Sequence, residues 1–242
     1  MSGHSKWANI KNRKEAMDKK KGNVFSKMAK LIEIAARKGG DPEKNPTLRL
    51  TIEKARSFNM PNENVVRAIK KGSGENKEGG QLEEGLYEAY GPEGSQLIIE
   101  TITDNKNRTL SDVRHILTEH GGRLAESGSV KWNFNQMGTI IVDKSKVASQ
   151  SKEELELKMI DAGAEDIRWR EDVLEIYAKP ENLEKLKEAI KRQNIEIEES
   201  GLGWVPKNEI EIKEPQAKKQ IETLFDELDE NDDVKDIFSN IM

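Results

Sequence analysis

The sequence predicts an α+β multidomain protein in which an N-terminal three-helix bundle is followed by two ferredoxin-like α/β domains, one inserted into the other. Apolar residues recur with a helical period over the first third of the 242-residue chain. After a glycine-rich segment, strand and helix patterns alternate in the order β-α-β-β-α-β, which is typical of the ferredoxin-like plait. Hydrophobic residues make up 34% of the chain and charged residues 35%, so several small domains fit the composition better than one deep core.

Three amphipathic helices are expected in the first third of the chain. We expect Asn23 to cap the first helix and Gly39-Gly40 to end it, because Asn suits an N-cap and Gly ends helices. The second helix starts at Asn45-Pro46, and the third starts near Pro61 and ends at Gly72. Their short connections favour a small bundle. The stretch GSGENKEGG that follows has the composition of a linker.

Two α/β units are expected after this linker. One is complete within residues 136–205, with a strand at 138–143, a helix at 152–162, strands at 165–169 and 173–177, a helix at 183–192 and a strand at 195–205. The flanking segments supply the other, with a strand at 97–103, a helix after the loop DNKNRT, strands at 129–134 and 209–212, a helix at 216–228 and a strand at 234–238. The predicted domains are residues 1–80, residues 81–135 together with 206–242, and residues 136–205.

Charge divides the chain into two unlike parts. Residues 1–78 contain 19 Lys and Arg against 9 Asp and Glu, a net charge of +10, although the whole chain has a net charge of −5. The remainder therefore carries −15. A basic domain of this kind has the electrostatic footprint of a polyanion-binding protein, because many cations facing one way release counterions from phosphates. The alternative is a solvated charged surface without a partner, but the basic excess runs through the whole bundle and favours nucleic acid.

We therefore predict a basic helical nucleic-acid-binding domain at the N-terminus, with the acidic α/β domains as candidates for binding a protein partner. The segment 5–20 has a thin apolar stripe of Trp7, Ile10 and Met17, which suggests an arm that orders on phosphate. The predicted nucleic-acid-binding residues of the N-terminal domain are Lys6, Trp7, Lys11, Arg13, Lys14, Lys19, Lys20, Lys21, Lys27, Lys30, Arg37, Lys38, Arg49 and Lys54.

The loop DNKNRT (Asp104 to Thr109) adds Lys106 and Arg108 to this set. It lies between a predicted strand and a predicted helix, where free backbone N–H groups favour a phosphate. The alternative is a helix start that Asn107 or Asp104 simply caps. Both interpretations stay open, and they are compatible with each other.

No catalytic or metal-binding pattern stands out. The chain has no cysteine, which excludes disulfides, thiolate metal sites and cysteine nucleophiles. His115 and His120 lack the spacing of four that places two imidazoles on one helix face, so we expect a surface pair. The acidic run DELDENDDVKD (Asp226 to Asp236) lacks the glycine and glutamate of an EF-hand loop and is expected to be a solvated helix end. Phosphate-binding loops and nucleophile elbows are also absent, so we expect neither an enzyme nor a cofactor.

The sequence has no signal-peptide pattern and no apolar run of the roughly 18 residues that a membrane span needs. A cytoplasmic protein without membrane contact is therefore expected.

Eight segments resemble, in this order along nearly the whole chain, the YebC/PmpR family: MSGHSKWANIKNRK, KGNVFSKMAKLI, NPTLRLTIEKA, NMPNENVVRAIKKGSG, YEAYGPEG, DNKNRTLSDVRH, GGRLAESGSVKWNF and DDVKDIF. The resemblance implies three domains and a protein described as a probable DNA-binding transcriptional regulator. Related members, including mitochondrial ones, are instead tied to translation at the ribosome on difficult nascent sequences such as proline runs. The resemblance also favours residues 3–7, Lys11, Arg13, Lys14 and the loop 105–109 as functional surface.

The sequence is therefore compatible with two functions. The first is a DNA-binding regulator of transcription, and the second is a translation factor associated with ribosomal RNA. Against the first, no helix-turn-helix is evident, and a lysine-rich surface positions a protein on phosphates without reading bases. Against the second, no RNP-type aromatic pair lies on a predicted strand. Nucleic-acid binding is common to both.

Overall fold

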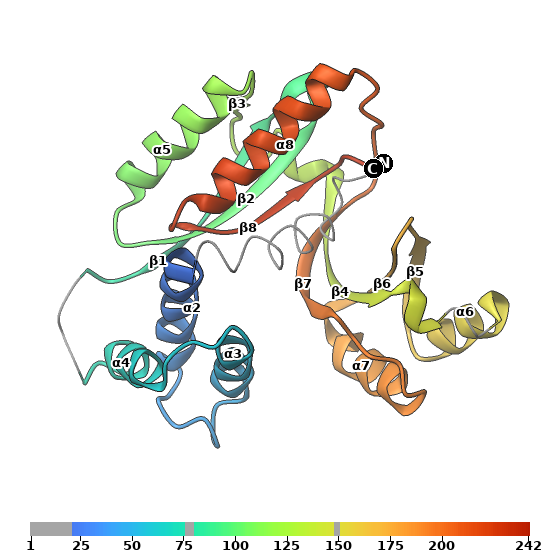
Figure 1. Cartoon of the computed structure of the whole chain (residues 1–242), viewed down its shortest axis with the longest axis horizontal. Coiled ribbons are helices and arrows are strands. Elements are labelled where there is room, and N and C mark those ends of the chain that lie inside the picture. Colours follow the sequence, from blue (N-terminus) through green and yellow to red (C-terminus); the bar gives the residue numbers. More distant parts are fainter. Residues whose placement is uncertain (1–20, 76–79, 148–150) are drawn as a thin grey trace.

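The structure, a computed structural model, describes residues 21–75, 80–147 and 151–242. Its elements form an N-terminal group of helices followed by two four-stranded antiparallel sheets with helices packed on them (Figure 1). The expected fold class, α+β multidomain with the helical part first, is confirmed.

The N-terminal helices are α2 (Lys21–Ala36), α3 (Pro46–Ser57) and α4 (Asn62–Gly72). α3 starts at Asn45-Pro46 as expected, and Asn45 is its cap, because its side-chain oxygen accepts the N–H of Leu48 at 3.1 Å. The amide of Asn45 also donates to the carbonyl oxygens of Ala35 and Gly39, so one buried side chain joins two helices. The core they share contains Ile32, Leu48, Ile52, Ala55 and Val65.

The expected cap of α2 is wrong. Asn23 lies within α2, and its side-chain amide donates to the backbone oxygen of Glu230 at 2.8 Å. An asparagine that could cap a helix is here used to bind a distant segment.

The inserted unit has the predicted topology. It consists of β4 (Phe134–Asp143), α6 (Lys152–Asp161), β5 (Ala164–Trp169), β6 (Val173–Ala178), α7 (Leu183–Arg192) and β7 (Glu199–Pro206). The strands lie in the order β5-β6-β4-β7, and every neighbouring pair is antiparallel, which is the ferredoxin-like arrangement. Buried side chains from α6 and α7 cover the sheet and form its core, with Leu155, Met159, Leu186 and Ile190 at its centre.

The outer unit is assembled from both flanks of this insertion. It consists of β1 (Glu83–Tyr90), β2 (Gln96–Thr103), α5 (Lys106–Glu119), β3 (Arg123–Leu124), α8 (Pro215–Glu230) and β8 (Val234–Ser239). The strand order is β3-β1-β2-β8, and α5 and α8 pack together over this sheet (Figure 1).

Two predicted strands of the outer unit are wrong. The position expected for residues 209–212 is filled by β1, which pairs with β2 over its whole length. Ile210 makes only an isolated bridge to Ile241, while Ile212 is buried in the core. Residues 129–133 form a turn and a short 3₁₀ helix, because the carboxylate of Glu88 accepts three of the backbone N–H groups in this segment and its preceding turn.

The two sheets meet along β7 and β8. Phe238 of β8 packs with Ile98, Val130 and Phe134, and Trp204 of β7 lies against this cluster. The indole of Trp204 donates to Glu100 at 3.0 Å, which ties the inserted sheet to β2 of the outer sheet.

Polar contacts support the same joint. Glu209 accepts hydrogen bonds from Arg168, at 2.6 Å, and from Arg170. Both arginines belong to the inserted unit, whereas Glu209 lies on the returning segment between β7 and α8. The segment that leaves the inserted unit is thus fixed to it by a partly buried ion-pair network.

Candidate nucleic-acid interface

The predicted basic residues of the helical bundle fall into two groups in the structure. Members of the first group pair with groups elsewhere in the chain. Members of the second group are exposed and have no carboxylate partner among the residues that the structure describes.

Lys27 and Lys30 of α2 belong to the first group, and they face the end of α8 and the start of β8. The ammonium group of Lys27 lies 3.1 Å from a carboxylate oxygen of Asp229. That of Lys30 lies 2.5 Å from Asp233 and also donates to the backbone oxygen of Asp232 at 2.9 Å. Their side chains are only 14% and 22% exposed, so much of each cation is committed to this contact.

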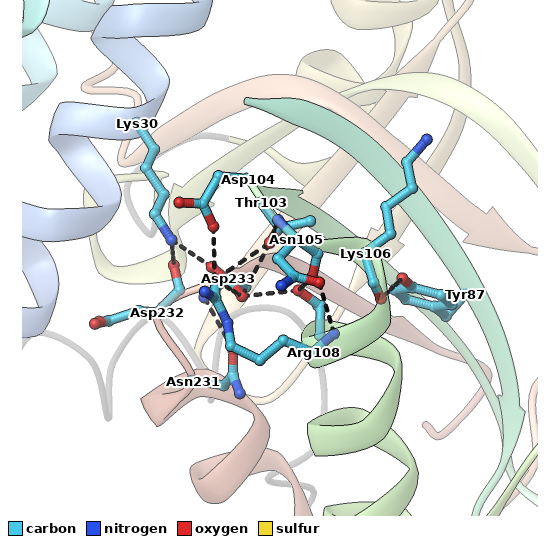
Figure 2. A network of polar contacts seen from close by, with 11 residues as sticks. Lys30, Tyr87, Thr103, Asp104, Asn105, Lys106, Arg108, Asn231, Asp232 and Asp233 are labelled. Carbon is cyan, nitrogen blue, oxygen red and sulfur yellow. Dashed lines mark hydrogen bonds and ion pairs between the residues drawn. The ribbon is translucent and has the colours of Figure 1, made fainter. Parts of the chain in front are cut away.

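Asp233 is the centre of this contact (Figure 2). One of its oxygens binds Lys30, and the other accepts hydrogen bonds from the guanidinium of Arg108 at 2.8 Å and from the hydroxyl groups of Thr109 and Thr103 at 2.7 and 3.1 Å. Burial of Asp233 raises the pKa of its carboxyl group, but the hydrogen bonds from Lys30, Arg108 and Thr109 outweigh that effect and lower the pKa to about 2. Asp233 is therefore ionised at neutral pH and joins α2, β2, α5 and β8.

The start of α5 is capped by Asn105, and neither Asn107 nor Asp104, the two candidates of the alternative interpretation, is the cap. The side-chain oxygen of Asn105 accepts the N–H of Arg108 at 3.1 Å. Asn105 can take this position because its own N–H donates to the hydroxyl of Thr103 at 2.9 Å, which sets the turn.

Both cations of the DNKNRT loop have partners within the chain. Lys106 lies 2.5 Å from Glu83, and Arg108 lies 2.9 Å from Asp104 in addition to its contact with Asp233. The carboxylate of Asp233 thus lies beside the helix start where the sequence suggested a phosphate. Both side chains are about half exposed, so phosphate contact through their outer edges stays a prediction.

The acidic run is more than a solvated helix end, and that expectation is wrong for Asp229 and Asp233. Asp229 and Asp233 bind lysines of α2, and Asp233 is buried with 4% of its surface exposed. The acidic segment therefore attaches the helical bundle to the outer α/β unit.

Arg37 and Lys54 also contact other parts of the chain. Arg37 donates to the backbone oxygen of Leu82 at 2.6 Å, just before β1. Lys54 lies at 4.0 Å from Glu199 of the inserted unit and remains half exposed.

The second group forms the outer surface of the bundle, which we call the basic surface. Its members are exposed and make no ion pair within the described part of the chain: Lys38, Arg49, Arg56, Arg67 and Lys70. Helical spacing places Arg67 and Lys70 on one side of α4 and Arg49 and Arg56 on one side of α3. Of these five, the sequence predicts only Lys38 and Arg49 as site residues.

Seven predicted residues lie outside the described residues: Lys6, Trp7, Lys11, Arg13, Lys14, Lys19 and Lys20. The predicted arm at 5–20 lies there as well. Lys21 is the first residue of α2. The contribution of these eight residues stays a prediction.

Within the ranges 21–75, 80–147 and 151–242, no three His, Asp or Glu side chains are grouped so as to hold a metal ion. None of the helices in these ranges is both long enough and apolar enough to cross a membrane.

The fold and these contacts define a class: a three-part α+β protein whose basic helical bundle is fixed by an acidic segment to paired α/β units. Its family follows from comparison with known proteins. The model of the TACO1/YebC protein N-terminal domain matches residues 5–75, and that of the TACO1/YebC second and third domain matches residues 82–241. The chain belongs to the TACO1/YebC family, which confirms the resemblance seen in the sequence.

Relatives match over the full length of the chain. A protein of Thermoanaerobacter pseudethanolicus named probable transcriptional regulatory protein is 48% identical, covering 100% of this chain and 97% of its own. One of the same description from Pseudothermotoga lettingae is 48% identical over 99% of this chain and 93% of its own. The crystal structure of a conserved hypothetical protein, Aq1575, from Aquifex aeolicus is similar with a TM-score of 0.80, at 41% identity, covering 93% of this chain and 92% of that one.

Proposed function

We propose that the protein is a DNA-binding transcriptional regulatory protein that contacts the phosphate backbone through its basic helical bundle. The observation that carries the proposal is the basic surface, where Arg49, Arg56, Arg67 and Lys70 are exposed and unpaired within the described residues. An exposed cation without an internal partner can release counterions from nucleic acid when it contacts a phosphate. The names of the relatives, probable transcriptional regulatory proteins, support the same function.

The internal pairing of Lys27 and Lys30 sharpens the proposal. These two lysines fix the bundle to Asp229 and Asp233, so their charges hold the domain in place. Phosphate contact is then assigned to α3, α4 and the turn after α2. Because the acidic α/β units would repel a polyanion, the bundle approaches it with α3 and α4 leading.

A second candidate is a translation factor that binds ribosomal RNA. One structural observation favours it: both α/β units are four-stranded antiparallel sheets with helices on one face, an architecture that RNA-binding and ribosomal domains share. In this case too, the basic bundle would supply the phosphate contacts, while the acidic units would face protein.

Crosslinking in cells followed by sequencing of the attached nucleic acid tests these proposals. Recovery of promoter DNA is expected for the regulator, and recovery of ribosomal RNA would establish the second candidate instead. A variant with Arg49, Arg56, Arg67 and Lys70 replaced by Gln should lose most of the recovered nucleic acid. Full recovery with this variant would remove the basic surface from the proposal.

A further inference from the structure

The loop between β3 and β4 presents an exposed tryptophan, Trp132, on a rigid support. The side chain is 58% exposed, and it is the only aromatic among the large apolar side chains that are exposed in the described part of the chain. This loop belongs to the motif GGRLAESGSVKWNF, for which the basic surface provides no role. Tryptophan is enriched at interfaces, because its ring combines a large apolar area with a polar N–H group.

A buried carboxylate fixes the backbone of this loop. Glu88 of β1, with 4% of its surface exposed, accepts the backbone N–H groups of Gly128, Val130 and Lys131 at 2.6 to 2.7 Å. Three charge-assisted hydrogen bonds to consecutive parts of one loop leave its backbone little freedom.

The tryptophan ring itself is also fixed. Its indole N–H donates to the backbone oxygen of Ser129 at 2.9 Å, and the hydroxyl of Tyr90 donates to the same oxygen at 3.0 Å. The ring is therefore oriented before any ligand arrives, and a partner that stacks on it avoids much of the entropy cost of ordering it.

Two lysines lie beside this loop: Lys131 precedes Trp132 in the chain, and Lys207 contacts the backbone of Trp132. The ammonium group of Lys207 donates to the backbone oxygen of Trp132 at 2.6 Å, and that of Lys131 lies 4.9 Å from the centre of the Trp204 ring. Both side chains are exposed, and neither forms an ion pair with a carboxylate among the described residues. This loop is thus a locally basic and aromatic site on an otherwise acidic part of the protein.

We propose that Trp132, with Lys131 and Lys207, is a stacking site for an unpaired nucleobase whose phosphates contact the two lysines. Aromatic side chains in a locally basic surface are the combination with which proteins bind single-stranded nucleic acid. A duplex hides its base faces in its own stack, so this site selects single-stranded or looped segments. The proposal rests on the proposed nucleic-acid binding and adds a partner class to it.

Fluorescence anisotropy with a labelled single-stranded oligonucleotide, as RNA and as DNA, and with the duplex of the same sequence tests this site. Trp132→Ala should weaken single-strand binding about tenfold, in the range that base stacking provides, and leave duplex binding unchanged. Trp132→Phe retains a ring and should keep most of the affinity. Leu157→Ala, at a side chain that is 62% exposed on α6, is the matched control and should change neither.

The outcomes separate this inference from the proposal on which it rests. Wild-type protein that binds neither form would overturn both. Wild-type protein that binds both forms, with no effect of Trp132→Ala or an equal loss for single strand and duplex, would overturn the stacking site alone. In that case the tryptophan would face a protein partner.

Discussion

The guanidinium of Arg108 donates to the carboxylate of Asp233 at 2.8 Å, although 125 positions separate the two residues in the chain. The same carboxylate binds Lys30 of the helical bundle. One buried anion therefore connects three segments: the first helix of the bundle, the start of α5 and the strand that closes the outer sheet (Figure 2).

Replacing Asp233 by Asn should destabilise the protein by about 1 to 3 kcal/mol. The amide removes the charge that Lys30 and Arg108 share, and it places an N–H₂ group where the carboxylate accepted hydrogen bonds. The free energy of unfolding in urea measures the effect. Asp232→Asn is the matched control, because the Asp232 side chain is exposed and only its backbone oxygen contacts Lys30. Equal losses for both variants would contradict the assignment.

The stability difference between wild type and Asp233→Asn should also depend on pH. The pKa of Asp233 is lowered from 3.8 to about 2 in the folded protein, so its carboxylate contributes stability that is fully present above about pH 4. That contribution should decline as the pH falls from about 4 toward 2. The stability difference between wild type and Asp233→Asn, measured by urea unfolding at each pH, should therefore be constant near neutrality and shrink below pH 4. A difference that stays constant down to the lowest pH would mean that folding does not lower the pKa of Asp233.

Gly72 allows α4 to pack closely on α2. A Cβ atom at this position would lie 2.2 Å from the backbone oxygen of Glu33 and 2.8 Å from the side chain of Ala36. Gly72→Ala should therefore cost about 1 to 3 kcal/mol, although alanine is the better helix former. Gly201→Ala is the control, since a Cβ atom there meets nothing within 4 Å. Thermal unfolding followed by circular dichroism should show a lower midpoint for Gly72→Ala alone.

Glu88→Gln should loosen the loop that carries Trp132. Burial raises the pKa of Glu88, but backbone hydrogen bonds from Gly128, Lys131 and Val130 outweigh it and lower the pKa, so the group is an anion. Glutamine offers one acceptor oxygen in place of two, and the amides of these three residues should exchange with solvent about tenfold faster or more.

Two controls accompany the Glu88 measurement. Glu84→Gln changes an exposed residue of the same strand and should leave the exchange rates unchanged. Within Glu88→Gln itself, the amide of Ala125 should remain protected, because it donates to the backbone oxygen of Glu88 at 2.8 Å. Faster exchange at Ala125 as well would indicate general loss of β1 rather than loss of the carboxylate.

Local patterns were sufficient for the helices and for the inserted plait. Asn45-Pro46, Pro61 and Gly72 mark helix ends through residue types whose preferences are local. The inserted unit has all six elements in one continuous segment, and its cycle of strands and helices is therefore visible in the sequence.

Apart from the cap of α5, which Thr103 sets locally, the errors share one physical cause, which is a partner far away in the chain. The segment EEGLYEAY of β1 has no regular alternation of apolar and polar residues, and pairing with β2 and β3 stabilises it as a strand. Residues 129–133 have β-type residues but are held in a turn by Glu88, which lies about forty positions earlier. Acidic residues in the run 226–236 look alike in the sequence, and no local signal marks Asp233 as the one that Lys30 and Arg108 bind.

The candidate site could be predicted only in outline. The uneven charge distribution along the chain identifies the basic domain. The sequence alone does not show which of its cations form ion pairs within the folded protein. Contacts over more than 200 positions commit Lys27 and Lys30 to the acidic segment, whereas Arg56, Arg67 and Lys70 remain exposed. Trp132 and Asp233 lie in two segments that resemble the family, GGRLAESGSVKWNF and DDVKDIF. The resemblance does not indicate which residues they contact.

The central claim is that α3 and α4 bind phosphates, and the salt dependence of duplex DNA binding tests it most directly. The logarithm of the affinity should fall steeply and linearly with the logarithm of the salt concentration. Replacing Arg49, Arg56, Arg67 and Lys70 by Gln should make this slope shallower by about 3 to 4, since each phosphate contact contributes about 0.9. A control that replaces four exposed lysines of the α/β units without ion-pair partners in the described chain, Lys185, Lys191, Lys213 and Lys219, should keep the wild-type slope. A slope that is flat for the wild type, or equal for wild type and the bundle variant, would contradict the account.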